Sequence, residues 1–204
     1  MALSRTSRAS ILAAFVLGGG ALVGAPGQSA AAADAFPIEP SDLQFSATIV
    51  SDPQRDEGEP AITPDRNGNI YTCGPTGFST ANDYAQISTD GGDQFHLLGT
   101  APRGQIAAGQ GGGDCALATA ITPNAQGQYA LAYAGLGPLT NFSTATSANS
   151  GRTFAASATS ESIPGVDRQW IAFSDDKTAF LTYNNLALNK VVQKSVDAGL
   201  TYNT

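Results

Sequence analysis

Three observations predict an all-β fold made of repeated antiparallel units in this chain of 204 residues. One eight-residue pattern occurs three times, short runs of strand-forming residues precede each copy, and no long segment has the apolar period of an α-helix. Internal repeats of this kind indicate that similar structural units follow one another along the chain. We therefore expect a series of small antiparallel sheets.

The repeated octet has the pattern Ser, any residue, Asp or Asn, any residue, Gly, any two residues and an aromatic residue. An Asp or Asn side-chain oxygen can accept hydrogen bonds from nearby backbone amides, and glycine reaches positive φ without steric cost. The octet thus predicts a tight turn between two strands. Its defining residues are Ser88, Asp90, Gly92 and Phe95 in the first copy, Ser147, Asn149, Gly151 and Phe154 in the second, and Ser195, Asp197, Gly199 and Tyr202 in the third.

Strand and turn segments upstream of each octet supply the other elements of each unit. Two strands joined by a turn come first, and a further strand, clearest at residues 84–87, leads into the octet. The predicted first two strands of the units are 60–63 and 70–73, then 115–122 and 128–133, then 169–173 and 178–183.

The octets resemble the Asp box, or bacterial neuraminidase repeat, of the sialidase-like β-propellers. This resemblance implies four-stranded blades, with each box between the third and outermost strands, on the side away from the ligand. The octet starts are 59 and 48 residues apart, which suits a blade of roughly 40 to 50 residues plus loops. We expect about three blades, at residues 57–100, 112–158 and 165–204, in an incomplete ring that is the N-terminal portion of a longer propeller.

Residues 1–33 have the three parts of a secretory signal peptide. Arg5 and Arg8 supply the positive start, an apolar run covers residues 11–23, and a stretch of small residues ends at Ala33. We predict a bacterial-type signal cleaved near Ala33 and a secreted, extracellular mature chain.

The mature chain is expected to begin with a segment at residues 34–56 that leads into the propeller. The whole sequence has a net charge of −7, and removal of the two signal arginines gives the mature chain a net charge of −9. Such a surface repels the phosphates of nucleic acid, and no later stretch approaches the ~20 apolar residues of a membrane helix. The expected partners exclude nucleic acid, the mature chain is expected to contain no membrane span, and the resemblance implies an extracellular glycan or glycoprotein.

The two cysteines, Cys73 and Cys115, have two possible states. They form a disulfide in an oxidising compartment, or they are buried free thiols. Two cysteines cannot form a tetrahedral zinc site by themselves, and the only histidine, His96, is expected in an outer strand with a structural role. We expect no metal and no cofactor, with calcium left open as an alternative.

Three acidic residues, Glu59, Asp114 and Asp167, each precede an expected innermost strand, which in a propeller lines the central channel. Three interpretations compete for them. The carboxylates cap loop amides, they bind sugar hydroxyls or act as general acid, or they bind calcium. Spacing does not separate these interpretations.

Arg168 and Trp170 lie at the start of the third innermost strand. An arginine beside an aromatic ring can clamp a carboxylate while the ring stacks on a sugar. The alternative is that Trp170 packs between blades and Arg168 pairs with Asp167 or another acid. Arg103 lies in a glycine-rich loop at residues 99–113 that we expect to border the ligand face.

The resemblance also implies a catalytic set: an arginine triad, an aspartate acid/base, and a tyrosine nucleophile activated by a glutamate. Only Arg55 stands in the region of the first triad arginine, and Asp56, Glu57 and Asp114 are the candidate catalytic acids. The function expected is therefore a sialidase-like propeller acting on extracellular glycans, by exo-glycosidase hydrolysis if it is an enzyme. The alternative is a non-catalytic propeller that binds carbohydrate or protein through its loop face.

Overall fold

The computed structural model describes residues 44–54, 57–75, 83–98, 114–137, 141–157, 165–187 and 189–203. The predicted signal peptide, Asp56 and Arg103 lie outside these residues. Two units are distinguished, Met1–Ser46 and Ala47–Thr204, and every strand belongs to the second. None of the elements in the described part of the chain is a helix of the length and apolarity needed to cross a membrane.

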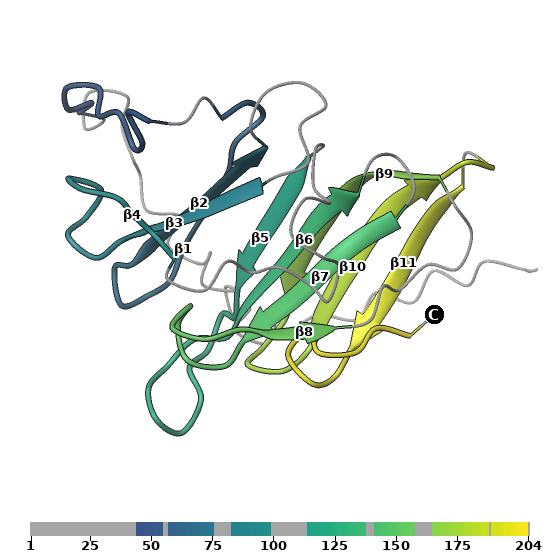
Figure 1. Ribbon diagram of the computed structural model, residues 1–204. Helices are drawn as coiled ribbons and strands as arrows, with labels where there is room; N and C mark the ends of the chain where they lie inside the picture. The colour runs from purple at the N-terminus through teal and green to yellow at the C-terminus, as the bar shows by residue number, and fades with distance from the viewer. Residues whose placement is uncertain are drawn as a thin grey trace, which may run out of the picture. The chain divides into compact units, whose positions relative to one another are not determined.

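In the part of the chain that the structure describes, eleven strands form three antiparallel sheets, which follow one another in chain order (Figure 1). Sheet 1 contains β1 (Ala61–Pro64), β2 (Ile70–Pro75), β3 (Asp83–Ser88) and β4 (His96–Leu97). Sheet 2 contains β5 (Cys115–Thr119), β6 (Leu131–Gly137), β7 (Asn141–Ser147) and β8 (Ala155–Ser157). Sheet 3 contains β9 (Val166–Phe173), β10 (Ala179–Asn185) and β11 (Lys190–Ser195). The predicted all-β class is confirmed.

Within each sheet every strand pairs with the next one in sequence. In sheet 3, Asn203 forms an isolated antiparallel bridge with Lys194 of β11, and both backbone amides donate across it, at 2.8 and 2.9 Å. This bridge stands where β4 and β8 pair in the other two sheets. Each unit is therefore a meander whose innermost strand is its first.

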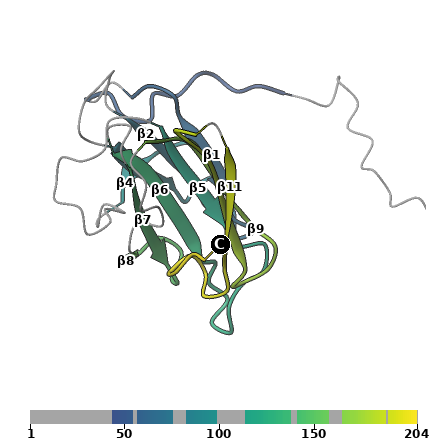
Figure 2. The same ribbon diagram turned by 90° about the vertical axis from the view of Figure 1, so that its right-hand side faces the viewer.

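Sheet 2 is covered on both faces, which explains its apolar sequence. All seven residues of β6 are buried, whereas in β10 buried residues alternate with half-buried ones. A strand buried on one face shows a period of two, and a strand between two neighbouring sheets does not. Figure 1 shows sheet 2 between sheets 1 and 3, and Figure 2 turns the molecule so that sheet 3 faces the viewer.

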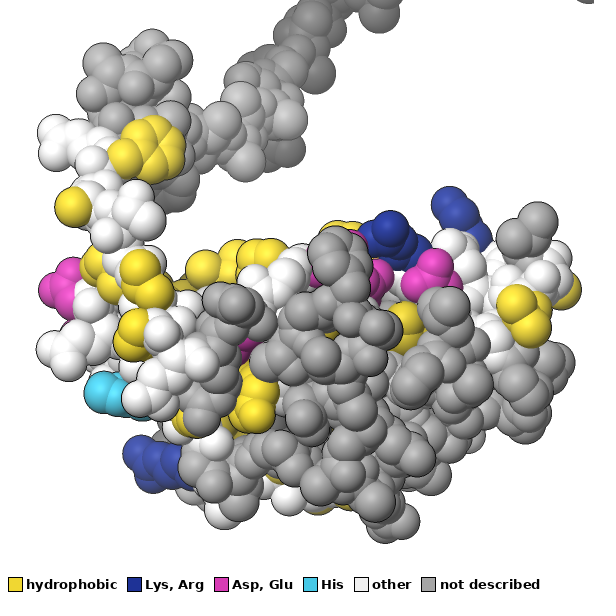
Figure 3. Space-filling view, turned by 45° about the horizontal axis from the view of Figure 1, so that its top comes forward, with side chains coloured by type: hydrophobic (Ala, Val, Ile, Leu, Met, Phe, Trp, Pro, Cys, Tyr) yellow, Lys and Arg dark blue, Asp and Glu magenta, His cyan; other side chains and the backbone are white. Residues whose placement is uncertain are grey.

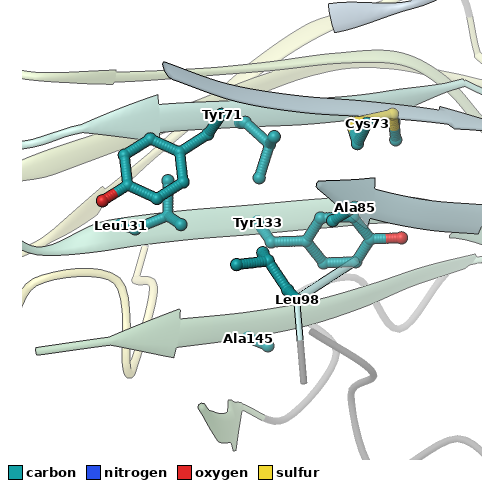
Figure 4. Packing of buried hydrophobic residues seen from close by; sticks show 9 residues of the cluster. Tyr71, Cys73, Ala85, Leu98, Leu131, Tyr133 and Ala145 are labelled. Atoms are coloured by element: carbon teal, nitrogen blue, oxygen red, sulfur yellow. A yellow bond between two sulfur atoms is a disulfide. The ribbon is translucent and has the colours of Figure 1, made fainter. Parts of the chain in front are cut away.

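Two apolar clusters join the three sheets. The first lies between sheets 1 and 2 (Figure 4) and contains Tyr71, Cys73, Ala85, Leu98, Cys115, Leu117, Leu131, Tyr133 and Ala145. The second lies between sheets 2 and 3 and contains Ala134, Leu136, Phe142, Val166, Leu181 and Tyr183. In it the rings of Phe142 and Tyr183 meet edge to face, with centroids 4.9 Å apart, a geometry that aromatic pairs favour.

The three octet turns have the same hydrogen bonds. The serine Oγ donates to the Asp or Asn Oδ1 at 2.7, 2.9 and 2.8 Å, and accepts the glycine N–H at 2.8, 2.9 and 2.8 Å. The same Oδ1 accepts the amide of the seventh octet residue at 3.0, 2.9 and 2.9 Å. Each turn follows the third strand of its sheet, and all three octet glycines have positive φ, as the pattern predicts.

The fourth octet position, which the pattern leaves open, also has left-handed backbone. Its residues are Gly91, Ser150 and Ala198, at φ of 82°, 56° and 60°. This conformation accompanies contacts with the preceding sheet: Tyr71 Oη donates to the carbonyl of Ser150 at 3.2 Å, and Thr146 Oγ1 donates to that of Ala198. The octets therefore connect neighbouring sheets as well as closing a hairpin.

Candidate functional site

The innermost strands β1, β5 and β9 line a cavity of about 430 Å³. Its walls are residues 59–62, 114–117 and 168–171, so each sheet contributes the start of its first strand. The octet turns lie at the opposite ends of the strands. The cavity therefore unites residues that are far apart in the sequence.

Two of the predicted acids, Glu59 and Asp114, meet in this cavity. Their side chains are hydrogen-bonded, and this bond together with the negative charge of Asp114 raises the pKa of the Glu59 carboxyl. Partial desolvation and the charge of Asp167 act in the same direction, and the positive charge of Arg168 opposes them. Glu59 therefore retains its proton to a higher pH than an isolated glutamate does.

Arg168 lies on the other side of the same acid pair. Its Nη1 is 3.5 Å from Asp114 Oδ2, and the two side chains are 61% and 20% exposed. The sequence left open that Arg168 pairs with Asp167 or another acid, and in the structure its partner is Asp114. Because the Arg168 side chain is largely exposed to solvent, we assign this ion pair a role in orientation and charge, and only a small contribution to stability.

The backbone at Arg168 departs from a regular strand. Trp170 pairs with Thr182 and Asp167 with Asn184, so Arg168 and Gln169 together face a single residue of β10. This is a β-bulge, and Arg168 takes a φ of 55°. Bulges redirect side chains next to functional sites. Glu59, with a φ of 41°, is a second residue of the cavity wall with left-handed backbone.

Asp167 differs from the other two acids. It lies inside β9 rather than before the strand, and its Oδ1 accepts the backbone amide of Arg168 at 2.9 Å. This contact is the amide cap proposed as one interpretation of the acids, and it stabilises the bulge. Among the described residues no group of three acidic, histidine or cysteine side chains is close enough to hold a metal ion; calcium binding stays a prediction.

Gln169 is a wall residue that the sequence interpretation missed. Its side chain is only 3% exposed, and its Nε2 donates to the backbone carbonyls of Asp114 and Ala134. Its Oε1 is buried without a hydrogen-bond partner among the described residues. The sequence could have drawn attention to Gln169 only through its position between Arg168 and Trp170. The bulge that turns its side chain inward has no sequence signature here.

Trp170 is 68% exposed, so the expectation that it packs between blades is wrong. The bulge at Arg168 and Gln169 turns Gln169 toward sheet 2 and leaves the Trp170 ring open to solvent beside the cavity. Ile62, on β1, is 67% exposed in the same wall. Figure 3 shows basic and acidic side chains next to one another, near hydrophobic ones, on the face in view.

The remaining candidates lie apart from this cavity or outside the described residues. Glu57 accepts a hydrogen bond from the buried Gln86 at 2.9 Å and is absent from the cavity wall. His96 is exposed in β4, the outer strand expected for it. Cys73 and Cys115 form a disulfide between β2 and β5, so the free-thiol alternative is wrong.

Comparison with known proteins gives structural neighbours. No protein-family model and no curated protein matches the chain. It is similar to the GH93 α-L-arabinofuranosidase of Fusarium graminearum in complex with arabinobiose, at 11% identity and a TM-score of 0.54, over 72% of this chain and 46% of that one. It is also similar to a Penicillium chrysogenum α-L-arabinanase complexed with arabinobiose, at 12% identity and a TM-score of 0.52, over 71% and 47%.

A Hadza microbial sialidase, Hz136, matches at 15% identity and a TM-score of 0.47, over 74% of this chain and 33% of that one. At these identities the likeness concerns the fold. The chain spans about half the length of the arabinofuranosidase and the arabinanase that it matches. Its three sheets are blades of a β-propeller, and the cavity lies at their innermost strands.

Proposed function

We propose that this propeller acts on carbohydrate through the cavity at β1, β5 and β9. The observation that carries the proposal is the Glu59–Asp114 carboxyl pair beside the exposed ring of Trp170. Carboxylates accept hydrogen bonds from sugar hydroxyls, and an exposed aromatic ring offers a face for a sugar ring to stack on. The neighbours named above, described with arabinobiose, have the same fold and agree with this class of ligand.

Glu59 is the candidate general acid for glycoside cleavage. A general acid must keep its proton near the working pH and lose it to the leaving-group oxygen during the reaction. The hydrogen bond to Asp114 raises the pKa of Glu59 and so favours its protonated form. Its exposure leaves the proton accessible to a bound sugar.

A second candidate function is binding without catalysis, and the closeness of the two carboxyls favours it. Paired glycosidase carboxyls lie about 5 to 5.5 Å apart in retaining enzymes and about 6.5 to 9.5 Å apart in inverting ones. Glu59 and Asp114 are in direct hydrogen-bond contact, so they do not flank a glycosidic bond between them. Cleavage requires another carboxylate as nucleophile or base, and Asp167, which precedes the wall residue Arg168, is a candidate.

The experiment is an assay of sugar release and sugar binding by the purified chain. Neutral oligosaccharides, including arabinobiose, and sialylated glycans serve as substrates, with Glu59→Gln as the test variant. Glu57→Gln, which changes an acid away from the cavity wall, is the matched control. Release of sugar that Glu59→Gln abolishes and Glu57→Gln retains supports hydrolysis. Binding without release supports the second function, and neither binding nor release contradicts the proposal.

Finer expectations accompany this proposal. The octets are inferred to be Asp boxes, because their serine, Asp or Asn, and glycine form the same turn three times, each between the third strand and the segment that follows it. Sialidase-type hydrolysis is the corresponding activity, and the sialylated substrates above test it. Cleavage of sialic acid by the chain and its loss in Arg168→Ala would support that activity.

Export is likewise proposed. The disulfide between Cys73 and Cys115 supports it, because disulfides persist in oxidising compartments. Expression of the complete sequence in a bacterial host should release a mature chain into the periplasm or medium, with its new N-terminus near Asp34. Retention of the uncleaved chain in the cytoplasm would contradict export.

A further inference from the structure

The cavity wall contains several hydrogen-bond acceptors. The carboxyls of Glu59 and Asp114 lie in the wall, the negative charge of Asp167 acts on Glu59 from beside it, and the buried Oε1 of Gln169 has no partner among the described residues. The Nε2 donor of Gln169 is already used by two backbone carbonyls. A complementary ligand must therefore bring donors.

The charge of the cavity wall also favours a ligand without a carboxylate. Arg168 is the one basic side chain in the described wall at residues 59–62, 114–117 and 168–171, and its Nη1 lies 3.5 Å from Asp114 Oδ2. A carboxylate on a ligand would have to compete with Asp114 for this guanidinium. It would also come close to the charge of Asp167, and like charges at short range repel one another.

The rest of the wall is apolar. The exposed side chains of Trp170 and Ile62 border the polar group and carry no charge. An aromatic face binds the C–H surface of a sugar ring, whose hydroxyls at the ring edge can then reach neighbouring acceptors. Sugar hydroxyls both donate and accept, whereas an ionised carboxylate only accepts.

We propose that this cavity selects uncharged, hydroxyl-rich sugars over sugars that carry a carboxylate. The selection follows from three features together: the acceptor-rich wall, the engagement of Arg168 by Asp114, and the exposed ring of Trp170. This inference rests on the proposed carbohydrate function and specifies the substrate class of the same site. It disfavours sialic acid, the substrate of the sialidase-type hydrolysis considered above.

The test uses calorimetric titration of the complete purified chain with matched disaccharides. Neutral disaccharides of glucose, galactose and mannose are compared with the corresponding uronic-acid disaccharides, and arabinobiose and sialyllactose are added as further probes. We expect the neutral member of a bound pair to bind at least about tenfold more tightly at low salt. Tighter binding of the uronic-acid members or of sialyllactose would overturn the inference while leaving the carbohydrate function intact. If no probe binds, both the proposed carbohydrate function and the preference for neutral sugars are contradicted.

Asp114→Asn tests the physical cause of the selection. This variant removes one negative charge and the partner of Arg168, so the preference for neutral sugar should fall by about tenfold. Asp93→Asn makes the same charge change at an exposed position of the first octet turn and should leave the preference unchanged. An unchanged preference in a folded Asp114→Asn variant would contradict the role of the ion pair. Circular dichroism checks that both variants fold.

Discussion

The disulfide between Cys73 and Cys115 lies directly beside the Glu59–Asp114 carboxyl pair. Cys115 follows Asp114 in sequence, and Cys73 is paired in the β-ladder with Ala61, two residues beyond Glu59. Each cysteine is therefore anchored next to one of the two acids. The bond joins the first two blades and holds the two walls of the cavity together.

The first prediction concerns this disulfide. It closes a segment with a sequence separation of 42 residues, and the loop-entropy relation gives a stabilisation of about 4 kcal/mol for a loop of that length. We expect Cys73→Ser with Cys115→Ser to lower the free energy of unfolding by that order, as measured by urea denaturation. The same variant should move the pKa of Glu59 back toward its usual value, because the two walls separate.

Treatment of the wild-type chain with a reductant is the control for this pair of substitutions. It breaks the same bond without changing the side-chain volume in the core, and should give a similar loss of stability. An unfolding midpoint that is indifferent to both treatments would show that the apolar cluster alone joins the first two blades.

The second prediction concerns the serine of the octet turns. Ser147 is 1% exposed, donates to Asn149, and accepts the amide of Gly151 at 2.9 Å. Ser147→Ala leaves a buried amide without its acceptor, which costs about 1 to 3 kcal/mol. Thermal or urea unfolding measures the loss, and Ser51→Ala at an exposed position is the control. Equal stability of the two variants would mean that the serine is dispensable to the turn.

The third prediction concerns the left-handed residue at the fourth octet position. Ala198 has a φ of 60°, a conformation in which the Cβ of an L-residue is crowded. The corresponding residue of the first octet is Gly91. We expect Ala198→Gly to stabilise the chain by about 1 kcal/mol and Gly91→Ala to destabilise it by a similar amount. Ala47→Gly, at a residue without positive φ, should be neutral or destabilising. A loss of stability in Ala198→Gly, or a gain in Gly91→Ala, would be incompatible with the observed backbone.

The fourth prediction concerns acid stability. Backbone amides of Thr178 and Lys177 donate to the Asp175 carboxylate and lower its pKa to about 2, while the unfolded value is about 3.9. The unfolded chain therefore binds the proton more readily, so this stabilisation is present above about pH 4 and is lost as the pH falls toward 2. Asp175→Asn should flatten the acid limb of the stability curve in this window.

Asp176→Asn makes the same charge change at the next residue and serves as the control for the acid limb. Stability is followed by urea unfolding between pH 2 and 6. Glu59 has the opposite effect on the pH dependence of stability, because its pKa is raised in the folded chain. Its contribution to stability is present at a pH below the usual glutamate pKa and is lost as the pH rises through the pKa of the folded chain. An identical acid limb in wild type and Asp175→Asn would contradict the amide contacts of Asp175.

Much of the fold was predictable because its signals are local. The octet of Ser147 to Phe154, for example, contains all the side chains that form its own turn, and the alternation of β10 reports one buried face. A second local repeat was overlooked. Asp65, Asn124 and Asp175 each begin the turn between the first two strands of a blade and accept its backbone amides.

The site was less predictable because it depends on packing between distant segments. The acids Glu59 and Asp114 were identified from their place before inner strands, but their contact requires the first two blades to pack together. The exposure of Trp170 and the burial of Gln169 both follow from one bulge, which reverses the side-chain alternation expected for a regular β9. A one-residue shift in register moves a side chain to the opposite face.

The most direct measurement is carbon-detected nuclear magnetic resonance of the Glu59 carboxyl during titrations with acid and with a neutral oligosaccharide. We predict that the Glu59 signal titrates above the usual range for glutamate, that Asp114→Asn lowers this pKa, and that the sugar shifts the signal at constant pH. A Glu59 carboxyl that titrates at its ordinary value and does not respond to any sugar would contradict the proposal that this cavity is a carbohydrate site.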